Sequence, residues 1–301
     1  MISGALLGEG SCLLAASVWA VTVAMFRRPI EAFGARTVNL AKCVISSALF
    51  LVTILALGRG SVLTAAPFHD VAFVALSGLV GLTAGDSALF AAVGRLGAYR
   101  ALLLQTLAPV FTAVFALAWR REVPRGTHLL GMALTLLGVA LVVAKRGGPD
   151  GAAPVASSRR TAGIVFGILA AVGQGGGIVL AKAGMGTLPS LHASFVRLGT
   201  AAAGLLLLGL LDGTLRRARE LSQAPPALGR VVPAAFMGSY VGIFLMMFGV
   251  GQAPAAVAAV LLSTTPVFSL FLDVARGRER FTLRAVAGTL TAIAGIAVLT
   301  Q

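Results

Sequence analysis

The sequence predicts an all-α integral membrane protein with ten transmembrane helices in two inverted five-helix repeats. Three observations carry this prediction: the composition, ten long apolar stretches and an internal repeat. Of the 301 residues, 58% are hydrophobic and 11% are charged, whereas roughly 25% of the residues of a soluble domain are charged. Because a soluble protein must present groups that water can solvate, this composition excludes a soluble enzyme, a disordered chain and a disulfide-rich secreted protein.

Ten stretches are long and apolar enough to cross a membrane as helices. A helix needs about 20 apolar residues to span the roughly 30 Å hydrocarbon core, and no stretch shows the alternation of a transmembrane strand. In chain order the stretches are 3–26, 37–57, 71–93, 98–119, 127–144, 161–181, 191–211, 231–250, 253–272 and 281–299. The first lacks the basic start and the cleavage site of a signal peptide, so we expect it to be a membrane helix.

Proline and threonine residues mark the ends of these stretches. Pro124 lies at an N1-like position near the start of the fifth stretch, and Thr282 lies at an N-cap-like position near the start of the tenth. Both residue types favour a helix start at these positions. The connections between stretches contain Pro29, Pro67, Pro189, Pro225 and Pro226.

The second half of the chain repeats the first. Under a shift of 157 residues the matched pairs include Gly81 with Gly238, Pro109 with Pro266, and Glu122 with Glu279. An adjustment of two residues places Lys42 opposite Arg197. Each half holds five stretches, an odd number, so the second half must enter the membrane from the opposite side. Inverted repeats of this kind are typical of secondary transporters, whose sites lie near mid-membrane between the halves.

A polar segment separates the two repeats. The residues at 145–160 read KRGGPDGAAPVASSRR, a composition rich in Gly, Ala, Pro and Ser that is typical of linkers. We therefore predict a first five-helix repeat over 1–145, a linker over 146–160 and a second, inverted repeat over 161–301.

The motifs in the two halves resemble a known family. The segment LQTLAPVF at 104–111 is followed by Glu122, Gly131 and Gly138, and its second copy, LLSTTPVF at 261–268, is followed by Glu279, Gly288 and Gly295. This pattern resembles the signature of EamA-type members of the drug/metabolite transporter superfamily, and the resemblance covers both halves. It implies ten helices in two repeats and transport of small organic solutes, often outward across a bacterial inner membrane, without naming the solute.

Four charged residues lie within the predicted spans and away from their ends: Glu9, Lys42, Asp86 and Arg197. A charge at the bilayer centre costs ~2.5–3.5 kcal/mol, so each needs a partner or a wet cavity. Asp86 either binds a substrate ammonium or exchanges protons in a cavity, or it forms an internal ion pair with Lys42 or Arg197. Glu9 lies nearer an interface, where it either reaches water and headgroups or couples transport to protons.

Other candidates have both a structural and a functional interpretation. The symmetric positions of Lys42 and Arg197 indicate either a shared architectural role or binding of an anionic part of the solute. Lys182, at the end of the sixth stretch, either reaches the surface or contacts the solute. Pro109 and Pro266 interrupt the fourth and ninth stretches, where each removes a backbone hydrogen bond. They act as gating kinks or simply fit the helices around their neighbours.

Uncharged polar side chains are expected to line a cavity between the halves. They are Ser17, Thr83, Gln105, Thr106, Gln174, Tyr240, Ser263 and Thr264. Trp19 and Tyr240 are the aromatic residues that we place near this cavity, in a chain with two Trp and two Tyr. This scarcity disfavours an aromatic cage for large flat drugs.

Positive charge is concentrated on one side of the predicted membrane. The net charge is +14, and of the 24 Lys and Arg residues 17 lie in connections that follow odd-numbered stretches, against five on the other side. This placement is typical of membrane topology and argues against nucleic acid as a partner. The positive-inside rule places both termini outside the cytoplasm, whereas the resemblance implies both inside. We prefer the charge count, and the orientation stays open.

Together these features predict a secondary transporter that moves a small polar organic metabolite, an amino acid or a similar compound, by alternating access in the export direction. The sequence has no phosphate-binding loop for ATP, so a gradient or exchange must drive transport, with protons as a candidate coupling ion. We expect no enzymatic activity, cofactor or metal, and a monomer or weak homodimer in a bacterial-type inner membrane. A membrane-embedded enzyme or lipid-handling protein, and a non-transporting helical scaffold, are the alternatives.

Overall fold

The computed structural model describes residues 4–96, 98–120, 126–143, 157–275 and 283–299, and these residues are almost entirely helical. The first half contains α1 (Gly4–Phe33), α2 (Ala35–Ala56), α3 (Ser61–Ala65), α4 (Phe68–Gly78), η1 (Leu79–Asp86), α5 (Ser87–Leu96), α6 (Ala98–Gln105), α7 (Ala108–Phe115), η2 (Ala116–Arg120) and α8 (Gly126–Val143). The second contains α9 (Ser157–Gly184), α10 (Ser190–Asp212), α11 (Thr214–Ser222), α12 (Pro225–Ala234), η3 (Ala235–Val241), α13 (Gly242–Gln252), α14 (Ala255–Leu262), α15 (Thr265–Ala275) and α16 (Leu283–Leu299). The segments η1, η2 and η3 are π-helical.

Each predicted span coincides with one helix or with consecutive helical segments. Six helices of the described residues, counting consecutive helical segments as one, are long and apolar enough to cross a membrane: Gly4–Phe33, Ala35–Ala56, Phe68–Leu96, Ser158–Gly184, Ser190–Asp212 and Pro225–Gln252. Shorter apolar helices occupy the other four predicted spans: Ala108–Trp119, Leu129–Gly138, Ala255–Ser269 and Val286–Gly295. The prediction of an all-α multi-pass membrane protein is therefore confirmed.

The first connection differs from the prediction. Pro29 does not lie in a connection, because α1 continues through it to Phe33. The connection to α2 is then the single residue Gly34, whose φ is 89°. A positive φ is strained for residues with a side chain, so this tight turn requires glycine.

Parts of the predicted boundaries fall outside the described residues. The linker predicted over 146–160 is described only from Ser157 onward, where α9 has already begun. The helix-start residues predicted for the fifth and tenth spans, Pro124 and Thr282, and the signature residues Glu122 and Glu279 also lie outside the described ranges.

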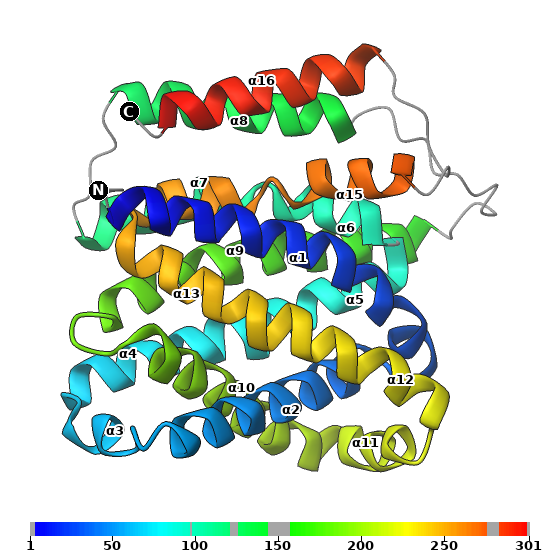
Figure 1. Cartoon of the computed structure of the whole chain (residues 1–301). Coiled ribbons are helices and arrows are strands. Elements are labelled where there is room, and N and C mark those ends of the chain that lie inside the picture. Colours follow the sequence, from blue (N-terminus) through cyan, green and yellow to red (C-terminus); the bar gives the residue numbers. More distant parts are fainter. Residues whose placement is uncertain (1–3, 97, 121–125, 144–156, 276–282, 300–301) are drawn as a thin grey trace.

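Helices of one half pack against helices of the other. α1 packs along η3 and α13, and its counterpart α9 packs along η1 and α5. α2 packs against α10, α7 against α14, and α8 against α16. These contacts follow the pseudo-twofold relation that inverted repeats produce. In Figure 1, α8 and α16 form a separate layer above the other helices.

Glycines allow the backbones to approach closely where the halves meet. A Cβ atom on Gly177 of α9 would lie 2.9 Å from the Cα of Gly81 in η1, and a Cβ on Gly138 of α8 would lie 2.3 Å from the backbone nitrogen of Ala292 in α16. Small residues serve the same purpose at helix crossings throughout membrane proteins. The repeated glycines seen in the sequence are thus packing residues.

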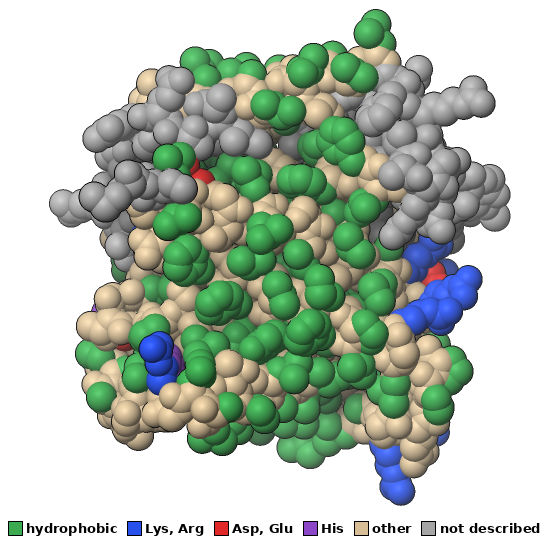
Figure 2. Space-filling model, viewed as in Figure 1, with side chains coloured by type: hydrophobic (Ala, Val, Ile, Leu, Met, Phe, Trp, Pro, Cys, Tyr) green, Lys and Arg blue, Asp and Glu red, His purple; other side chains and the backbone are tan. Residues whose placement is uncertain are grey.

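The outer surface suits a lipid environment. Figure 2 shows hydrophobic side chains spread over the middle of one face, while many Lys and Arg side chains gather toward one end of the helices. Val52 and Leu207, for example, are 64% and 67% exposed. Such extensive apolar exposure is favourable only against hydrocarbon.

Candidate functional site

A cavity of about 100 Å³ lies between the two halves and is lined by residues of both. Its polar lining residues are Trp19, Thr22, Lys42, Asp86, Gln105, Thr106, Gln174, Ser239, Ser263 and Thr265. Its apolar wall includes Phe26, Leu82, Leu89, Phe90, Ile178, Ile243 and Leu262. A mostly apolar cavity with a few convergent polar groups is the usual form of a small-molecule site.

An ion pair forms part of the cavity wall. Lys42 of α2 binds Asp86 at the end of η1, and the two side chains are 6% and 13% exposed. Lys42 Nζ also lies 5.1 Å from the centroid of the Phe90 ring, in a cation–π geometry. The pairing satisfies both charges inside the membrane. It also leaves both charged groups in contact with the space that a solute would occupy.

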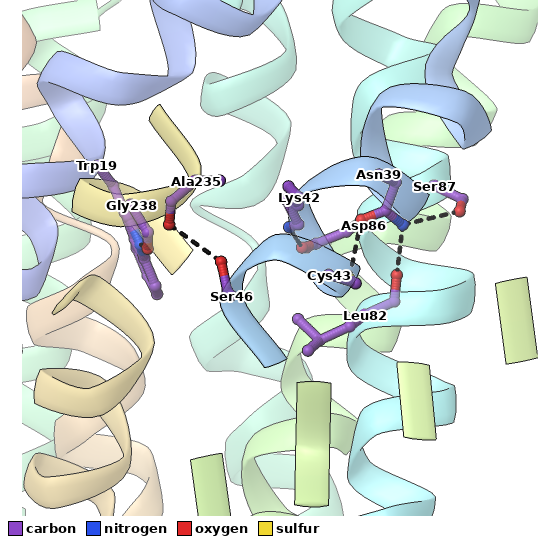
Figure 3. Close-up of polar contacts among 10 residues, drawn as sticks. All are labelled: Trp19, Asn39, Lys42, Cys43, Ser46, Leu82, Asp86, Ser87, Ala235 and Gly238. Carbon is purple, nitrogen blue, oxygen red and sulfur yellow. Dashed lines mark hydrogen bonds and ion pairs between the residues drawn. The ribbon is translucent and has the colours of Figure 1, made fainter. Parts of the chain in front are cut away.

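Neighbouring residues fix the two elements that carry this pair. Asn39, one turn before Lys42, donates from Nδ2 to the Leu82 carbonyl oxygen at 2.8 Å and to Ser87 Oγ at 3.0 Å. Cys43 Sγ contacts Asn39 Oδ1 at 3.6 Å and holds the amide in this orientation. Figure 3 shows these contacts beside the ion pair. The buried amide therefore locks α2 to η1 and α5.

The π-helical segment of the second half is held in the same way. The Trp19 indole Nε1 donates to the Gly238 carbonyl oxygen at 2.7 Å, and Ser46 Oγ donates to the Ala235 carbonyl oxygen at 3.1 Å (Figure 3). The widened turn of a π-helix is frequently found at functional sites. In both halves a π-helical segment borders the cavity, and side chains of other helices bind its carbonyl groups.

Two broken helices complete the cavity. Thr106 and Leu107 separate α6 from α7, whose first turn contains Pro109, and Ser263 and Thr264 separate α14 from α15. Proline lacks an N–H group and so cannot continue the backbone bonding of the preceding helix. Irregular backbone at membrane depth is tolerated where it lines a cavity or is buried in protein. The breaks bring Gln105 and Ser263 into the cavity wall.

Gln105 carries a hydrogen-bond acceptor without a partner. Its Oε1 is buried, and none of the described residues donates to it. Buried acceptors are nearly always satisfied in folded proteins, and an exception requires an explanation. A solute N–H group or a water molecule in the cavity would satisfy this oxygen.

Several predicted site residues lie outside the cavity. Tyr240 contacts Thr53 Oγ1 at 2.7 Å through its hydroxyl group and packs against Phe50, with ring centroids 4.5 Å apart. Thr83 donates to the Ala201 carbonyl oxygen at 3.2 Å. Glu9, Thr264 and Pro109 are buried but do not line the cavity.

Arg197 is also excluded from the cavity, although it is fully buried. Its Nη1 donates to the Gly177 carbonyl oxygen at 3.2 Å and to Ser77 Oγ at 3.5 Å. A Cβ on Gly81 would lie 2.7 Å from its Nη2. Arg197 therefore fills the space where η1 and α9 cross. The pseudo-twofold relation places this crossing opposite the one near Thr22 and Gly238, where the cavity lies.

Thr22, Ser239 and Thr265 also line the cavity but were not predicted from the sequence. Thr22 lies one turn after Trp19 and shares its helix face, and Ser239 adjoins Tyr240 in the π-helical segment. The helix face alone could have identified Thr22. Ser239 faces the cavity because the turn of the π-helix is wider than that of an α-helix. The sequence spacing does not indicate this wider turn.

The matches to known proteins fall on both halves of this architecture. The family model of EamA-like transporters matches residues 6–144 and 161–301. The chain belongs to the EamA-like transporter family. The two matched ranges correspond to the two halves, so the resemblance seen in the motifs is confirmed.

The fold of this EamA-like protein also occurs in a solved crystal structure. The two chains superpose with a TM-score of 0.75 at 22% identity, over 99% of this chain and 96% of the other. No curated protein matches the chain. The EamA family and the apolar helices identify a multi-pass membrane transporter of the drug/metabolite superfamily, with a small-molecule solute and the lipid bilayer as its partners.

Proposed function

We propose that this EamA-like protein is a secondary transporter for an amino acid or a similar zwitterionic metabolite. The observation that carries the proposal is the Lys42–Asp86 ion pair in the cavity wall. A zwitterion carries one carboxylate and one ammonium group, so its ammonium group can pair with Asp86 while its carboxylate pairs with Lys42. Two ion pairs then replace the single Lys42–Asp86 pair, and no charge is left unpaired. Leaving one buried charge without its partner costs roughly 3–5 kcal/mol, which disfavours solutes with a single charge.

The size and polarity of the cavity support a small solute. Its volume of about 100 Å³ is below the roughly 300–1,000 Å³ of pockets for drug-sized ligands. Gln105 Oε1, which accepts no hydrogen bond from the described part of the chain, is an acceptor for the ammonium group, and Ser263 and Thr265 supply further hydroxyl groups.

Alternating access is the mechanism that the inverted halves favour. The broken helices α6–α7 and α14–α15 border the cavity from both halves and provide positions where the chain can bend. We further propose that transport is outward and that protons are the coupling ion. Asp86 is the carboxylate among the residues that line the cavity, so we assign the coupling to this residue.

Uptake by purified protein in liposomes tests this proposal, with radiolabelled amino acids and with and without a pH gradient. We expect saturable uptake by the wild type, and at least about a tenfold loss in Asp86→Asn, since one buried pairing is removed. Asp212→Asn is the matched control, because Asp212 pairs with Arg36 outside the cavity, and it should transport normally. Unchanged transport and coupling in Asp86→Asn, or no zwitterion uptake above empty liposomes, would overturn the proposal.

A further inference from the structure

A second and larger hollow runs along the outside of the helix bundle. Its volume is about 1240 Å³, and it is lined by residues of α1, α2, η1, α5, α9, α10 and α11. The apolar part of the wall includes Leu79, Leu169, Val172 and Leu208. Leu169 and Leu208 are 52% and 41% exposed, so this wall faces the hydrocarbon of the membrane. We refer to this hollow as the basic groove.

One end of the basic groove is strongly positive. Arg36, Arg95, Arg159 and Arg217 line it together with the two carboxylates of Glu31 and Asp212. Arg36 pairs with Asp212, while the Arg95 guanidinium lies over the Phe166 ring, 4.7 Å from its centroid. Arg159 and Arg217 are exposed. The groove thus carries more cations than anions at one end and only apolar and small polar side chains at the other.

The length of the basic groove matches one leaflet of a bilayer. Its lining extends from Leu79 to Arg95 along η1 and α5, which is about 24 Å at a rise of 1.5 Å per residue. Half of a bilayer measures about 15 Å of hydrocarbon plus roughly 5–7 Å of headgroup region. With the arginines at the headgroup level, the apolar wall therefore lies at the depth of the acyl chains.

We propose that the basic groove binds one phospholipid with an anionic headgroup. The phosphate and the headgroup charge lie against Arg95, Arg159 and Arg217, and an acyl chain lies along Leu79, Leu169 and Leu208. Arginine is suited to this task because its planar fork binds phosphate oxygens in pairs. Clusters of basic residues next to membrane helices recognise anionic lipids through the same charge complementarity.

The basic groove and the solute cavity share one wall. Phe90 lines both, and the same ring receives Lys42 Nζ on the cavity side. An acyl chain bound in the groove would therefore pack against Phe90 from one side, while Lys42 of the ion pair contacts the ring from the cavity side. The lipid site does not depend on which solute the protein carries, so it can be tested without a transport assay.

Native mass spectrometry of the detergent-purified protein, loaded with equal amounts of phosphatidylglycerol and phosphatidylcholine, tests the proposal. We expect one retained phosphatidylglycerol per chain, with about tenfold higher occupancy than phosphatidylcholine. Arg217→Gln and the double variant R95Q/R217Q should reduce this preference stepwise. Arg219→Gln is the matched control, because it removes the same charge from α11 but lies outside the groove, and it should keep the preference.

A steric pair of variants separates the groove from general surface charge. Ala84→Trp would fill the groove and abolish retention of both lipids, while Ala203→Trp, on an exposed part of α10 outside the groove, should leave retention unchanged. Equal occupancy of the two lipids in the wild type, or unchanged retention in both R95Q/R217Q and Ala84→Trp, would overturn the proposal. Displacement by equimolar inorganic phosphate would also overturn it, since the site would then bind a free anion rather than a lipid.

Discussion

Lys42 and Arg197 occupy equivalent positions in the two repeats but have different surroundings. Lys42 pairs with Asp86, and the shift of 157 residues that relates the halves places Ile243 where the second carboxylate would be. Among the described residues, no carboxylate lies within hydrogen-bonding distance of Arg197, and its Nε and Nη2 atoms have no hydrogen-bond partner. One cation therefore depends on a carboxylate, whereas the other is held by backbone and hydroxyl groups.

This difference predicts that the same substitution destabilises the protein to different extents at the two positions. Lys42→Met leaves Asp86 buried and unpaired and should destabilise the fold by about 3–5 kcal/mol. Arg197→Met removes hydrogen bonds to the Gly177 carbonyl oxygen and Ser77 Oγ but breaks no ion pair among the described residues, so the loss of stability should be smaller, about 1–3 kcal/mol. Thermal unfolding of the two purified variants beside the wild type measures both effects. A larger loss in Arg197→Met would contradict the assignment of the two cations.

Gln105 provides a second prediction at the level of single residues. Gln105→Leu removes the acceptor that we assign to the solute ammonium and should raise KM by roughly three- to tenfold, the value of one hydrogen bond. The maximal rate should change little. Gln223→Leu, at the exposed residue that follows α11, is the control. If Gln105→Leu left KM unchanged, Gln105 would have no part in binding.

At the scale of elements, the apolar stretches identified the helices correctly, whereas Pro29 lies inside α1 rather than in a connection. They could not identify the π-helical segments η1 and η3. The extra residue in each of these turns is stabilised by side chains of other helices, such as Asn39 on the Leu82 carbonyl and Trp19 on the Gly238 carbonyl. These are tertiary contacts, which local composition does not encode.

The Asn39 contacts predict how strongly η1 depends on α2. Asn39→Leu removes one buried and one partly buried hydrogen bond and leaves the Leu82 carbonyl without its donor, so it should destabilise the protein by about 1–3 kcal/mol. Ser11→Ala, which removes an exposed bond within one helix, should have almost no effect. Chemical unfolding of both variants in detergent gives the comparison, and equal stabilities would contradict the proposed role of Asn39.

The close contact of α8 and α16 predicts a further effect of packing. Gly138→Val would place its side chain against the backbone of Ala292, and should force the two helices apart at a cost of about 1–3 kcal/mol or more. Gly126→Val in the same helix, where a Cβ meets no other atom within 4 Å, is the matched control. Unfolding temperatures of the purified variants measure the difference, and a Gly138→Val protein as stable as Gly126→Val would show that the two helices are not in contact.

At the scale of the whole molecule, the two halves interlock rather than stand side by side. The odd number of spans in each half predicted their inversion, but not which helices pair. The sequence also predicted which helix holds each candidate residue better than it predicted which side of that helix the residue lies on. Glu9 and Tyr240 were correctly placed in membrane helices yet lie outside the cavity, because the face depends on how α1 and η3 rotate against their neighbours.

Interlocking predicts that one half cannot fold alone. A chain ending at residue 145 would lack the helices that cover α1, α2 and α8, and would expose Lys42 and Ser46 to lipid. We expect it to aggregate or to be degraded, whereas the full chain should elute as a single species from a sizing column in detergent. A stable, monodisperse half would contradict this arrangement.

The single residue between α1 and α2 has a mechanical consequence. The two helices diverge from Gly34 (Figure 1), and one carries Trp19 while the other carries Lys42. A solute that contacts both side chains therefore contacts two helices that are joined by one residue. The angle between α1 and α2 changes through the backbone torsions of Gly34 and of the helix ends beside it.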